Sequence, residues 1–203
     1  MKIGTVILAA GESARMGSPK QLLPFRGKPL IRWMVDAAAG FDRGPSVIVV
    51  GAYAPEIRAS LGPLPADTVV VENLNWRRGM GSSLRVGLSH LLQAGPDVAA
   101  AVFLLCDQPW VNSDTLAALA AEHDRTRLPI VASAYANAMG VPALFFRELF
   151  PELLSLPDGQ GARAVIQADP SRTARIPFPE GAVDIDTPDA YRALCEANQP
   201  TLV

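Results

Sequence analysis

A glycine-bearing loop with two cations follows the first apolar run of the chain. The run ends at Ala10, and the loop from Gly11 to Lys20 contains mostly small residues together with Arg15. Glycines such as Gly11 and Gly17 adopt φ > 0 and let backbone N–H groups approach phosphate oxygens without a Cβ in the way. Arginine adds a planar fork of donors, and lysine adds a point charge. The loop therefore indicates a binding site for a polyphosphate.

This loop differs from the two commonest phosphate-binding loops. The spacing from Gly11 to Gly17 is too long for G-x-x-x-x-G-K-[ST], and Lys20 is followed by Gln21 instead of Ser or Thr. The pattern G-x-G-x-x-G is also missing from this segment. Kinase and dinucleotide-binding functions are therefore disfavoured. The alternative is an ordinary strand-to-helix connection whose arginine and lysine are solvated.

Carboxylates follow two other segments. Asp107 comes shortly after the apolar run of residues 99–105, so we expect it at the carboxyl edge of a sheet, near the glycine loop. Mg²⁺ prefers oxygen ligands and keeps several waters, so one or two carboxylates are enough. Asp184 and Asp186 are two positions apart in an extended segment, where alternate side chains share a face. The alternative is that Asp107 and Asp186 cap the turn and the helix that follow them.

Strands and helices that would position these residues alternate over about the first 135 residues. Short apolar runs without alternation predict strands buried on both faces, at residues 2–10, 46–51, 68–72, 99–105 and 130–134. Helical spacing covers residues 30–39, 55–61, 82–92 and 113–124, with Ser113 as the predicted N-cap of the last. The alternation predicts an α/β, Rossmann-like fold with a mostly parallel sheet flanked by helices. The weaker pattern after residue 134 predicts a strand at 144–146, helices at 147–156 and 161–168, and a closing helix that contains Tyr191.

Composition sets limits on the class of protein. The 203 residues are 49% hydrophobic and 19% charged, which is enough for one sizeable core, so we expect a single domain over residues 1–203. A net charge of -2 predicts no nucleic-acid partner and no membrane surface as partner. Cys106 and Cys195 are far apart and have no metal-like spacing, so a reducing, cytoplasmic location is expected.

The glycine loop is part of a longer pattern. Residues 8–24 have the sequence L-A-A-G-x-S-x-R-M-G-x-P-K-x-L-L-P, followed by G-K-P-L at residues 27–30. This pattern resembles the signature of the MobA-like nucleotidyltransferases, and within them it is most similar to the molybdenum cofactor cytidylyltransferases. The resemblance implies a GT-A-type nucleotidyltransferase fold. It also implies nucleotide contacts from the residues of this loop, which are Leu8, Ala9, Ala10, Gly11, Glu12, Ser13, Arg15, Met16, Gly17 and Lys20.

Other segments resemble further motifs of the same family. L-L-C-D-Q-P at residues 104–109 and D-x-D-T-P at residues 184–188 are similar to its metal-binding motifs, which implies Mg²⁺ bound by Asp107 and Asp186, with Asp184 as the second choice in the later motif. N-x-x-W-x-x-G-M-x-x-S-L at residues 73–84 implies base and ribose contacts from Gly81, Ser82 and Ser83. The alternative for that segment is a turn followed by a helix that Ser82 caps.

Two shorter segments resemble the acceptor-binding part of the family. They imply that the acceptor is contacted by Gly140, Pro142, Gly161 and Arg163, within an acceptor-side portion over about residues 136–203. The nucleotide-binding portion would then be residues 1–135. Val141 stands where the family often has His or Asn, which puts specificity for molybdopterin in question. The alternative is that these glycines and Pro142 only begin a strand and a helix.

The resemblance implies a reaction. The acceptor's phosphate attacks the α-phosphorus of a nucleoside triphosphate, and pyrophosphate leaves; Lys20, Arg15 and Asp107 are the expected catalytic residues. Ala10 stands where relatives that use guanine nucleotides carry glycine, so CTP is favoured over GTP, with a molybdopterin-type acceptor and a molybdoenzyme as client. The alternatives are a GTP-dependent guanylyltransferase, a sugar-phosphate nucleotidyltransferase, and a non-catalytic carrier of the molybdenum cofactor.

Overall fold

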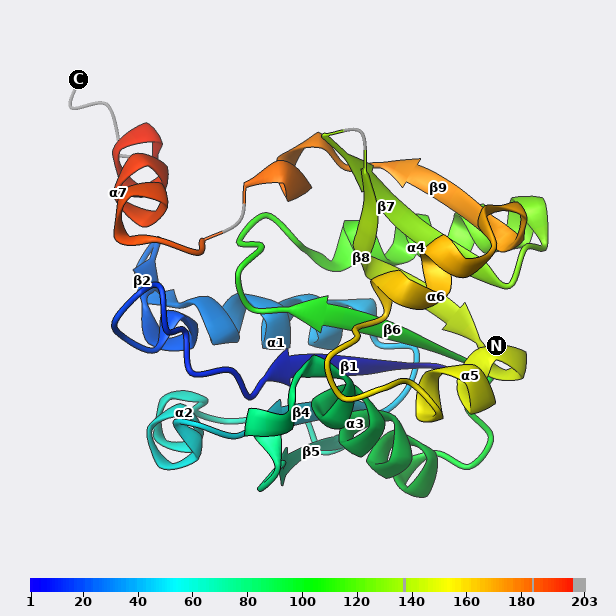
Figure 1. The fold of residues 1–203 in the computed structure, drawn as a ribbon, viewed down its shortest axis with the longest axis horizontal. Helices are drawn as coiled ribbons and strands as arrows, with labels where there is room; N and C mark the ends of the chain where they lie inside the picture. Colours follow the sequence, from blue (N-terminus) through cyan, green and yellow to red (C-terminus); the bar gives the residue numbers. More distant parts are fainter. Residues whose placement is uncertain (137, 184, 199–203) are drawn as a thin grey trace.

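A seven-stranded sheet runs through the molecule, with the strand order β5-β4-β1-β6-β8-β7-β9 (Figure 1). The structure is a computed structural model that describes residues 1–136, 138–183 and 185–198. The strands of this sheet are β1 (Ile3–Ala9), β4 (Ser46–Val50), β5 (Thr68–Glu72), β6 (Ala100–Leu105), β7 (Ile130–Tyr135), β8 (Ala138–Phe146) and β9 (Thr173–Pro177). A separate hairpin consists of β2 (Pro24–Phe25) and β3 (Lys28–Pro29).

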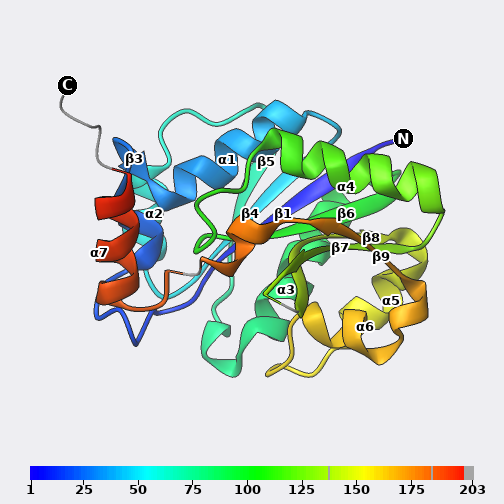
Figure 2. The same cartoon turned by 90° about the horizontal axis from the view of Figure 1, so that it is seen from above.

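Helices cover both faces of the sheet, and each face has its own apolar core (Figure 2). One core includes side chains of α1 (Leu30–Phe41), α2 (Ala54–Ser60) and α4 (Ser113–Thr126). The other includes side chains of α3 (Met80–Ala94), α5 (Phe150–Leu154) and α6 (Arg163–Ala168). Short 3-10 helices complete the layers at η1 (Lys20–Leu22), η2 (Trp76–Arg78), η3 (Arg147–Leu149), η4 (Pro170–Arg172) and η5 (Pro179–Ala182).

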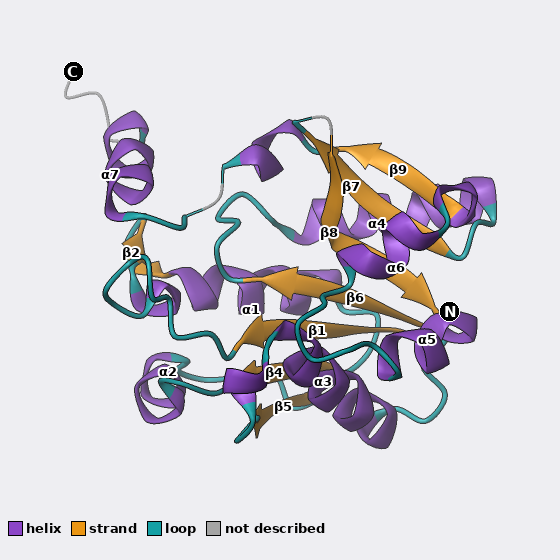
Figure 3. Ribbon diagram, viewed as in Figure 1, coloured by secondary structure: helices purple, strands orange, loops and turns teal. Residues whose placement is uncertain are grey.

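The last helix, α7 (Pro188–Ala197), packs away from the sheet and against the β2–β3 hairpin (Figure 3). A third, small core joins them, in which Phe25 of the hairpin and Leu194 of α7 are buried together with Ile185. The Tyr191 hydroxyl donates a hydrogen bond of 2.6 Å to the Pro24 carbonyl. The segment that follows β9 therefore returns to the glycine loop near the beginning of the chain.

The expected α/β fold with a mostly parallel sheet is confirmed. Strand β1 pairs in parallel with β4 and β6, β4 pairs in parallel with β5, and β7 pairs in parallel with β9. Only β8 runs against its neighbours β6 and β7 in the described sheet. Parallel strands end at one edge, so the residues that follow β1, β4 and β6 lie near one another.

Several local expectations need correction. Asn112, not Ser113, caps α4, because its side chain accepts a hydrogen bond of 3.0 Å from the Thr115 N–H. Helix α3 begins at Met80, so Ser82 lies inside the helix and is not its cap. Strand β5 is an edge strand with Val69 42% exposed, so it is not buried on both faces. No helix in the described ranges is long and apolar enough to cross a membrane.

Candidate active site

The loop after β1 is held by a buried glutamine in η1. Gln21 is 2% exposed, and its amide donates hydrogen bonds to the Ala9 carbonyl (3.2 Å) and the Gly11 carbonyl (2.9 Å). Its Oε1 accepts a hydrogen bond from the Ser13 hydroxyl, and the same hydroxyl accepts one from the Lys20 N–H. These bonds fold the loop back on itself and bring Lys20 to the carboxyl edge of the sheet.

Lys20 lies between two carboxylates from distant parts of the chain. Its Nζ is 2.6 Å from Asp107 Oδ2 and 3.0 Å from Asp186 Oδ1. Asp107 follows β6, and Asp186 lies just before α7. The second carboxylate also receives a hydrogen bond of 2.7 Å from Arg15 Nη2. The structure thus brings together four of the side chains that the sequence predicted for catalysis and metal binding.

The charge states of this cluster follow from its contacts. Burial lowers the pKa of Lys20, but Asp107 and Asp186 outweigh burial and raise the pKa above its ordinary value. Burial also acts against ionisation of Asp186, yet the hydrogen bonds and charges of Lys20 and Arg15 keep the pKa of its carboxyl below the ordinary value. At neutral pH the cluster therefore contains an ammonium group and ionised Asp186.

Asp186 is positioned by its neighbours in the chain. Ile185 is fully buried in the third core, and its N–H donates a hydrogen bond of 3.1 Å to the Asp107 carbonyl. Thr187 caps α7, because its hydroxyl accepts a hydrogen bond from the Ala190 N–H. The Asp186 carboxylate is therefore available to Lys20 and does not act as the helix cap. Asp184 lies outside the described residues.

The same carboxylates fit a divalent cation. Asp107 Oδ1 is buried without a hydrogen-bond partner among the described residues, while its Oδ2 and Asp186 Oδ1 both approach the Lys20 ammonium. A hard cation such as Mg²⁺ or Mn²⁺ takes one or two carboxylates and completes its coordination with waters and phosphate oxygens. No cluster of three or more His, Cys, Asp or Glu side chains occurs within the described ranges. Carboxylate oxygens are the ligands of a magnesium-type site, whereas zinc sites use mainly Cys and His side chains.

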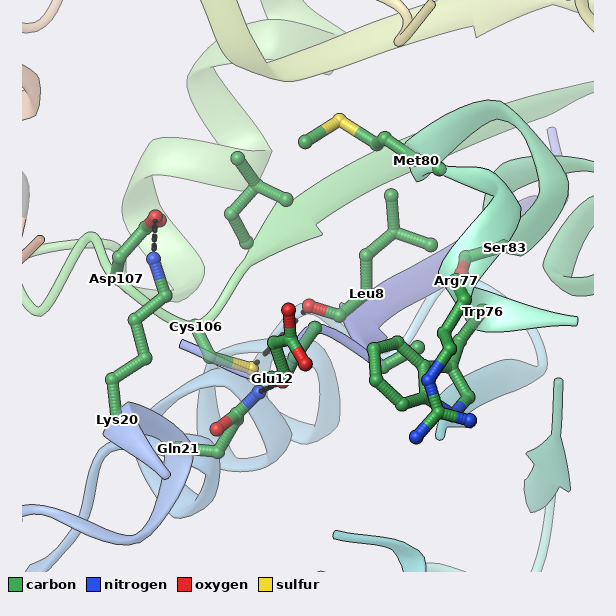
Figure 4. Close-up of a pocket in the computed structure, with 14 residues that line it drawn as sticks. Leu8, Glu12, Lys20, Gln21, Trp76, Arg77, Met80, Ser83, Cys106 and Asp107 are labelled. Atoms are coloured by element: carbon green, nitrogen blue, oxygen red, sulfur yellow. Dashed lines mark hydrogen bonds and ion pairs between the residues drawn. The ribbon is translucent and has the colours of Figure 1, made fainter. Parts of the chain in front are cut away.

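A cavity of about 530 Å³ lies beside Lys20 (Figure 4). Lys20 and Asp107 lie at one end of it, and Trp76, Arg77 and Ser83 lie at the other. Seven of the predicted residues line it, namely Leu8, Ala10, Gly11, Glu12, Lys20, Ser83 and Asp107. Outside its lining are Ala9, Ser13, Arg15, Met16, Gly17, Gly81, Ser82 and Asp186.

Some lining residues were not predicted. They are Gln21, Trp76, Arg77, Gly79, Met80, Leu105 and Cys106. Trp76 and Met80 belong to the motif at residues 73–84, so that motif carried a usable signal for them. Gln21 carried none, because a lone glutamine after a lysine is unremarkable in sequence.

Gly79 and Gly81 have a packing role at the start of α3. A Cβ on Gly81 would lie 2.3 Å from the Pro157 carbonyl oxygen, and a Cβ on Gly79 would lie 2.4 Å from the Asp158 carbonyl oxygen. The Gly81 N–H donates a hydrogen bond of 2.8 Å to the same Asp158 carbonyl. Both glycines therefore let residues 157–160 pack against the helix. A nucleotide contact from Gly81 remains a prediction.

The two adjacent serines at the start of α3 also bond to the protein itself. Asn73 Nδ2 donates to the hydroxyls of Ser82 (2.8 Å) and Ser83 (2.9 Å). The Ser82 hydroxyl in turn donates to the Gly79 carbonyl. Ser83 additionally lines the cavity, so of the two it is the better placed to contact a ligand.

Cys106 lies on the cavity wall but lacks the properties of a nucleophile. It is 3% exposed, and burial raises the pKa of its thiol. Its Sγ lies 3.6 Å from the Leu8 carbonyl, to which it donates. A reactive cysteine needs a lowered pKa, so Cys106 is a structural thiol.

The residues expected to contact the acceptor lie in three different places. Arg163 lines a second cavity of about 590 Å³ between α6 and β7–β9. Gly140 and Pro142 are buried in β8, where Gly140 makes room for the Tyr135 hydroxyl and the Pro142 carbonyl accepts a hydrogen bond from Ser133. The Val141–Pro142 peptide bond is cis. A Cβ on Gly161 would lie 2.6 Å from Met80 Sδ, at the rim of the first cavity.

Comparisons with known proteins find relatives along most of the chain. The MobA-like NTP transferase domain matches residues 5–174. The chain is 34% identical to the bifunctional protein GlmU of Syntrophotalea carbinolica over 64% of its length, but it spans only 27% of that protein. It is 30% identical to the nicotine blue oxidoreductase of Paenarthrobacter nicotinovorans, over 93% of this chain and 95% of that one.

Solved structures extend the comparison. Rv0371c from Mycobacterium tuberculosis is 32% identical and superposes with a TM-score of 0.81, covering 97% of this chain and 98% of that one. A structure of that protein in complex with manganese covers 97% of this chain and 100% of that one, with a TM-score of 0.76 and 30% identity. This chain belongs to the MobA-like NTP transferase domain family, a family of nucleotidyltransferases.

Proposed function

We propose that this protein transfers CMP from CTP to the terminal phosphate of a molybdopterin-type acceptor and releases pyrophosphate. The observation that carries the proposal is the position of the Lys20 ammonium, 2.6 Å from Asp107 and 3.0 Å from Asp186, at one end of a cavity formed by the loop after β1. Cations and carboxylates that converge on a glycine loop suit the handling of a triphosphate.

The acceptor needs no general base. A phosphate monoester has a second pKa of about 6, so it is already largely dianionic at neutral pH. The task of the protein is to align the two substrates and to neutralise their charge. Lys20 would act near the α-phosphate. Arg15, whose side chain is 73% exposed, is free to leave Asp186 and bind the departing pyrophosphate.

Mg²⁺ is the proposed cofactor, and Asp107 and Asp186 would hold it. Bound there, the ion supplies positive charge to the triphosphate. Asp107 Oδ1, which has no hydrogen-bond partner among the described residues, supports a cation at this place, and the manganese complex of the related Rv0371c supports a divalent cation in general. Lys20 keeps the two carboxylates close together, since its ammonium contacts both.

The preference for CTP is supported by the surroundings of Ala10. This residue is 4% exposed and lines the cavity. A Cβ placed on Gly51 would lie 2.9 Å from both Ala10 Cβ and Trp76 Cβ, so the Ala10 methyl belongs to the tightly packed wall beside Trp76. A methyl group in that wall leaves less room for a purine. Such a contact discriminates by about 1 to 3 kcal/mol.

An oxidoreductase is the second candidate. Nicotine blue oxidoreductase matches this chain along nearly the whole of both sequences, whereas GlmU extends far beyond it. A hydride transfer needs no pair of carboxylates around a lysine. The cluster of Lys20, Asp107 and Asp186 therefore favours nucleotidyl transfer.

Pyrophosphate release with Mg²⁺, each of the four NTPs and molybdopterin as acceptor tests the proposal. We expect the highest turnover with CTP, and turnover with GTP and ATP lower by about 10- to 200-fold. A higher turnover with GTP than with CTP would reassign the protein as a guanylyltransferase, and turnover with sugar phosphates but not with molybdopterin would mean that the acceptor is a sugar phosphate. Binding of molybdopterin without any turnover would favour a carrier. Consumption of NADH or NADPH with nicotine blue would favour the oxidoreductase.

A further inference from the structure

Carbonyl groups at the start of the loop after β1 are already bonded within the protein. The Ala9 and Gly11 carbonyls accept hydrogen bonds of 3.2 and 2.9 Å from the Gln21 side-chain amide. Between them, the Ala10 carbonyl accepts a hydrogen bond of 3.1 Å from the Ala52 N–H. Three successive carbonyl oxygens therefore have protein donors, and a single side chain holds two of the three.

The N–H groups of the same loop have no such partners. Residues 12–15 lie outside helices and strands, and none of their N–H groups donates a hydrogen bond to another part of the described chain. In a planar trans peptide, the C=O and N–H bonds point in opposite directions. Because the Gly11 carbonyl faces the Gln21 amide, the Glu12 N–H faces away from it. The loop thus offers unpaired donors while the carbonyls of residues 9–11 are occupied, which suits an anion.

Ser13 connects the two ends of this loop. It has a φ of +54°, and its carbonyl accepts a hydrogen bond of 2.8 Å from the Met16 N–H. Its hydroxyl donates to Gln21 Oε1 (3.4 Å) and accepts a hydrogen bond of 3.2 Å from the Lys20 N–H. A non-glycine residue with such a φ is held there by its surroundings. Gln21 therefore uses both its amide donors and its oxygen to hold the loop.

The amide of Gln21 is suited to this task. The side chain is 2% exposed and lies on the wall of the first cavity, beside Glu12 (Figure 4). Glutamate has the same shape, but an ionised carboxylate only accepts hydrogen bonds and would face two carbonyl oxygens. Methionine fills a similar volume without any N–H donor. Among side chains of this shape, the amide alone provides two donors together with an acceptor.

We propose that Gln21 is a positioning residue for phosphate binding. It holds the Ala9 and Gly11 carbonyls, so that the N–H groups of residues 12–15 are free to bind phosphate oxygens. This gives the protein a means of stabilising negative charge that is separate from the cations Lys20 and Arg15. That the phosphates belong to a nucleoside triphosphate rests on the proposed function. The orientation of the donors rests on the hydrogen bonds of Gln21.

Binding of inorganic pyrophosphate tests this role without any enzyme activity. Calorimetry at a fixed Mg²⁺ concentration compares the wild type with Gln21→Met, which keeps the volume of the side chain and removes its hydrogen bonds. We expect the dissociation constant for pyrophosphate to rise about 10-fold, because backbone donors to a charged group are lost. In NMR spectra at saturating pyrophosphate, the amide signals of residues 12–15 should move in the wild type and move less in the variant.

Two further variants separate hydrogen bonding from packing. Gln21→Glu keeps the shape and removes both donors, so it should weaken pyrophosphate binding at least as much as Gln21→Met does. Ser13→Ala removes one partner of Gln21 and leaves its bonds to the two carbonyls in place. We expect a smaller rise in the dissociation constant from Ser13→Ala, about 3-fold. Unchanged pyrophosphate binding by Gln21→Glu would contradict the positioning role.

His123→Phe is the matched control. His123 is 7% exposed on α4, and its Nδ1–H donates a hydrogen bond of 2.9 Å to the Leu128 carbonyl. Neither residue lines the first cavity. The variant keeps a ring and loses a buried hydrogen bond to a carbonyl, so it should lower the Tm and leave pyrophosphate binding unchanged. Equal weakening by Gln21→Met and His123→Phe, or a wild type that binds no pyrophosphate, would overturn the positioning role.

Nucleotide binding separates this inference from the proposed function. Gln21→Met should weaken binding of CTP about 10-fold and leave binding of cytidine unchanged, because cytidine has no phosphate. A purely structural role for Gln21 would weaken both. Weakened pyrophosphate binding by Gln21→Met in a protein that turns over no NTP would overturn the proposed function alone. Unaltered binding of pyrophosphate and CTP by Gln21→Met, with normal turnover by the wild type, would overturn the positioning role alone.

Discussion

The two cavities differ in how their cations are neutralised. At the first, Lys20 and Arg15 are both paired with carboxylates before any ligand is present. At the second, Arg163 and Arg175 have no partner within the described residues. Paired cations are held in place in advance, which suits groups that act on a transition state. Unpaired cations gain their partner only when a ligand enters, which suits groups that determine affinity.

This comparison predicts that Lys20→Ala has the largest effect. We expect kcat for pyrophosphate release to fall about 100- to 1,000-fold, because a charge aimed at the reacting phosphate is lost. KM for CTP should change much less. Steady-state kinetics measures both quantities. Lys2→Ala is the control, since Lys2 is exposed and pairs with Asp97 at the surface. A raised KM for CTP with an unchanged kcat would mean that Lys20 contributes to binding and not to the transition state.

Asp186→Asn should have the next largest effect. The variant loses one of the two carboxylates that fit a divalent cation, so we expect half-maximal activity to need about 10- to 100-fold more Mg²⁺. Titration of the assay with Mg²⁺ measures this requirement. Asp189→Asn, which removes an exposed carboxylate near Arg192, should leave it unchanged. An unaltered Mg²⁺ requirement in Asp186→Asn would confine Asp186 to pairing with Lys20 and Arg15.

Ile185→Ala tests whether the position of Asp186 matters, because the variant removes a buried apolar side chain and changes no charge. The side chain is fully buried, so its truncation should lower the free energy of unfolding by about 2 to 5 kcal/mol. Because Asp186 is the next residue, the Mg²⁺ requirement should also rise in assays well below the Tm. Ile57→Ala on α2 is equally buried and should lower only the stability. Identical behaviour of the two variants would show that the third core does not position Asp186.

The smallest expected effect is on the pH dependence of stability, and it concerns Asp158 in the loop between α5 and α6. A hydrogen bond from Arg85, opposed by partial burial and assisted by Arg78, holds the pKa of Asp158 below its ordinary value of 3.8. A lowered pKa in the folded state stabilises the protein above about pH 4, and this contribution is lost as the pH falls through the folded-state pKa. The Tm difference between wild type and Asp158→Asn should therefore shrink from about pH 6 to about pH 3. A difference that grows with acid would reverse the assigned sign.

The sequence predicted five strands of the sheet, β1, β4, β5, β6 and β7, because they are short aliphatic runs. Residues 68–72 were predicted with the bounds that the structure has for β5. Strand β9 was missed, since Thr173–Pro177 contains an arginine and ends in proline, and only Ala174 and Ile176 are apolar on its buried face. Most of β8 was missed as well, because Gly140 and Pro142 are typical of loops.

The sequence predicted the individual residues of the site, but it did not predict how they contact one another. The motifs identified Lys20, Asp107 and Asp186 separately, but their mutual contact depends on the return of the chain to the hairpin. The Arg15–Asp186 pair joins residues 171 positions apart, which no local pattern encodes. Arg175 stands in no motif, and the side of the sheet that it faces is set by the alternation of β9.

The late position of β9 and Asp186 has a consequence for synthesis on the ribosome. Strands β5, β4, β1 and β6 lie side by side in the sheet, and all of them emerge before β9 does. A nascent chain can therefore bring Lys20 to Asp107 while Asp186 is still missing. Translation thus separates synthesis of the nucleotide loop from completion of its charge cluster, and the growing polypeptide gains Asp186 only after every described strand of the sheet has been made.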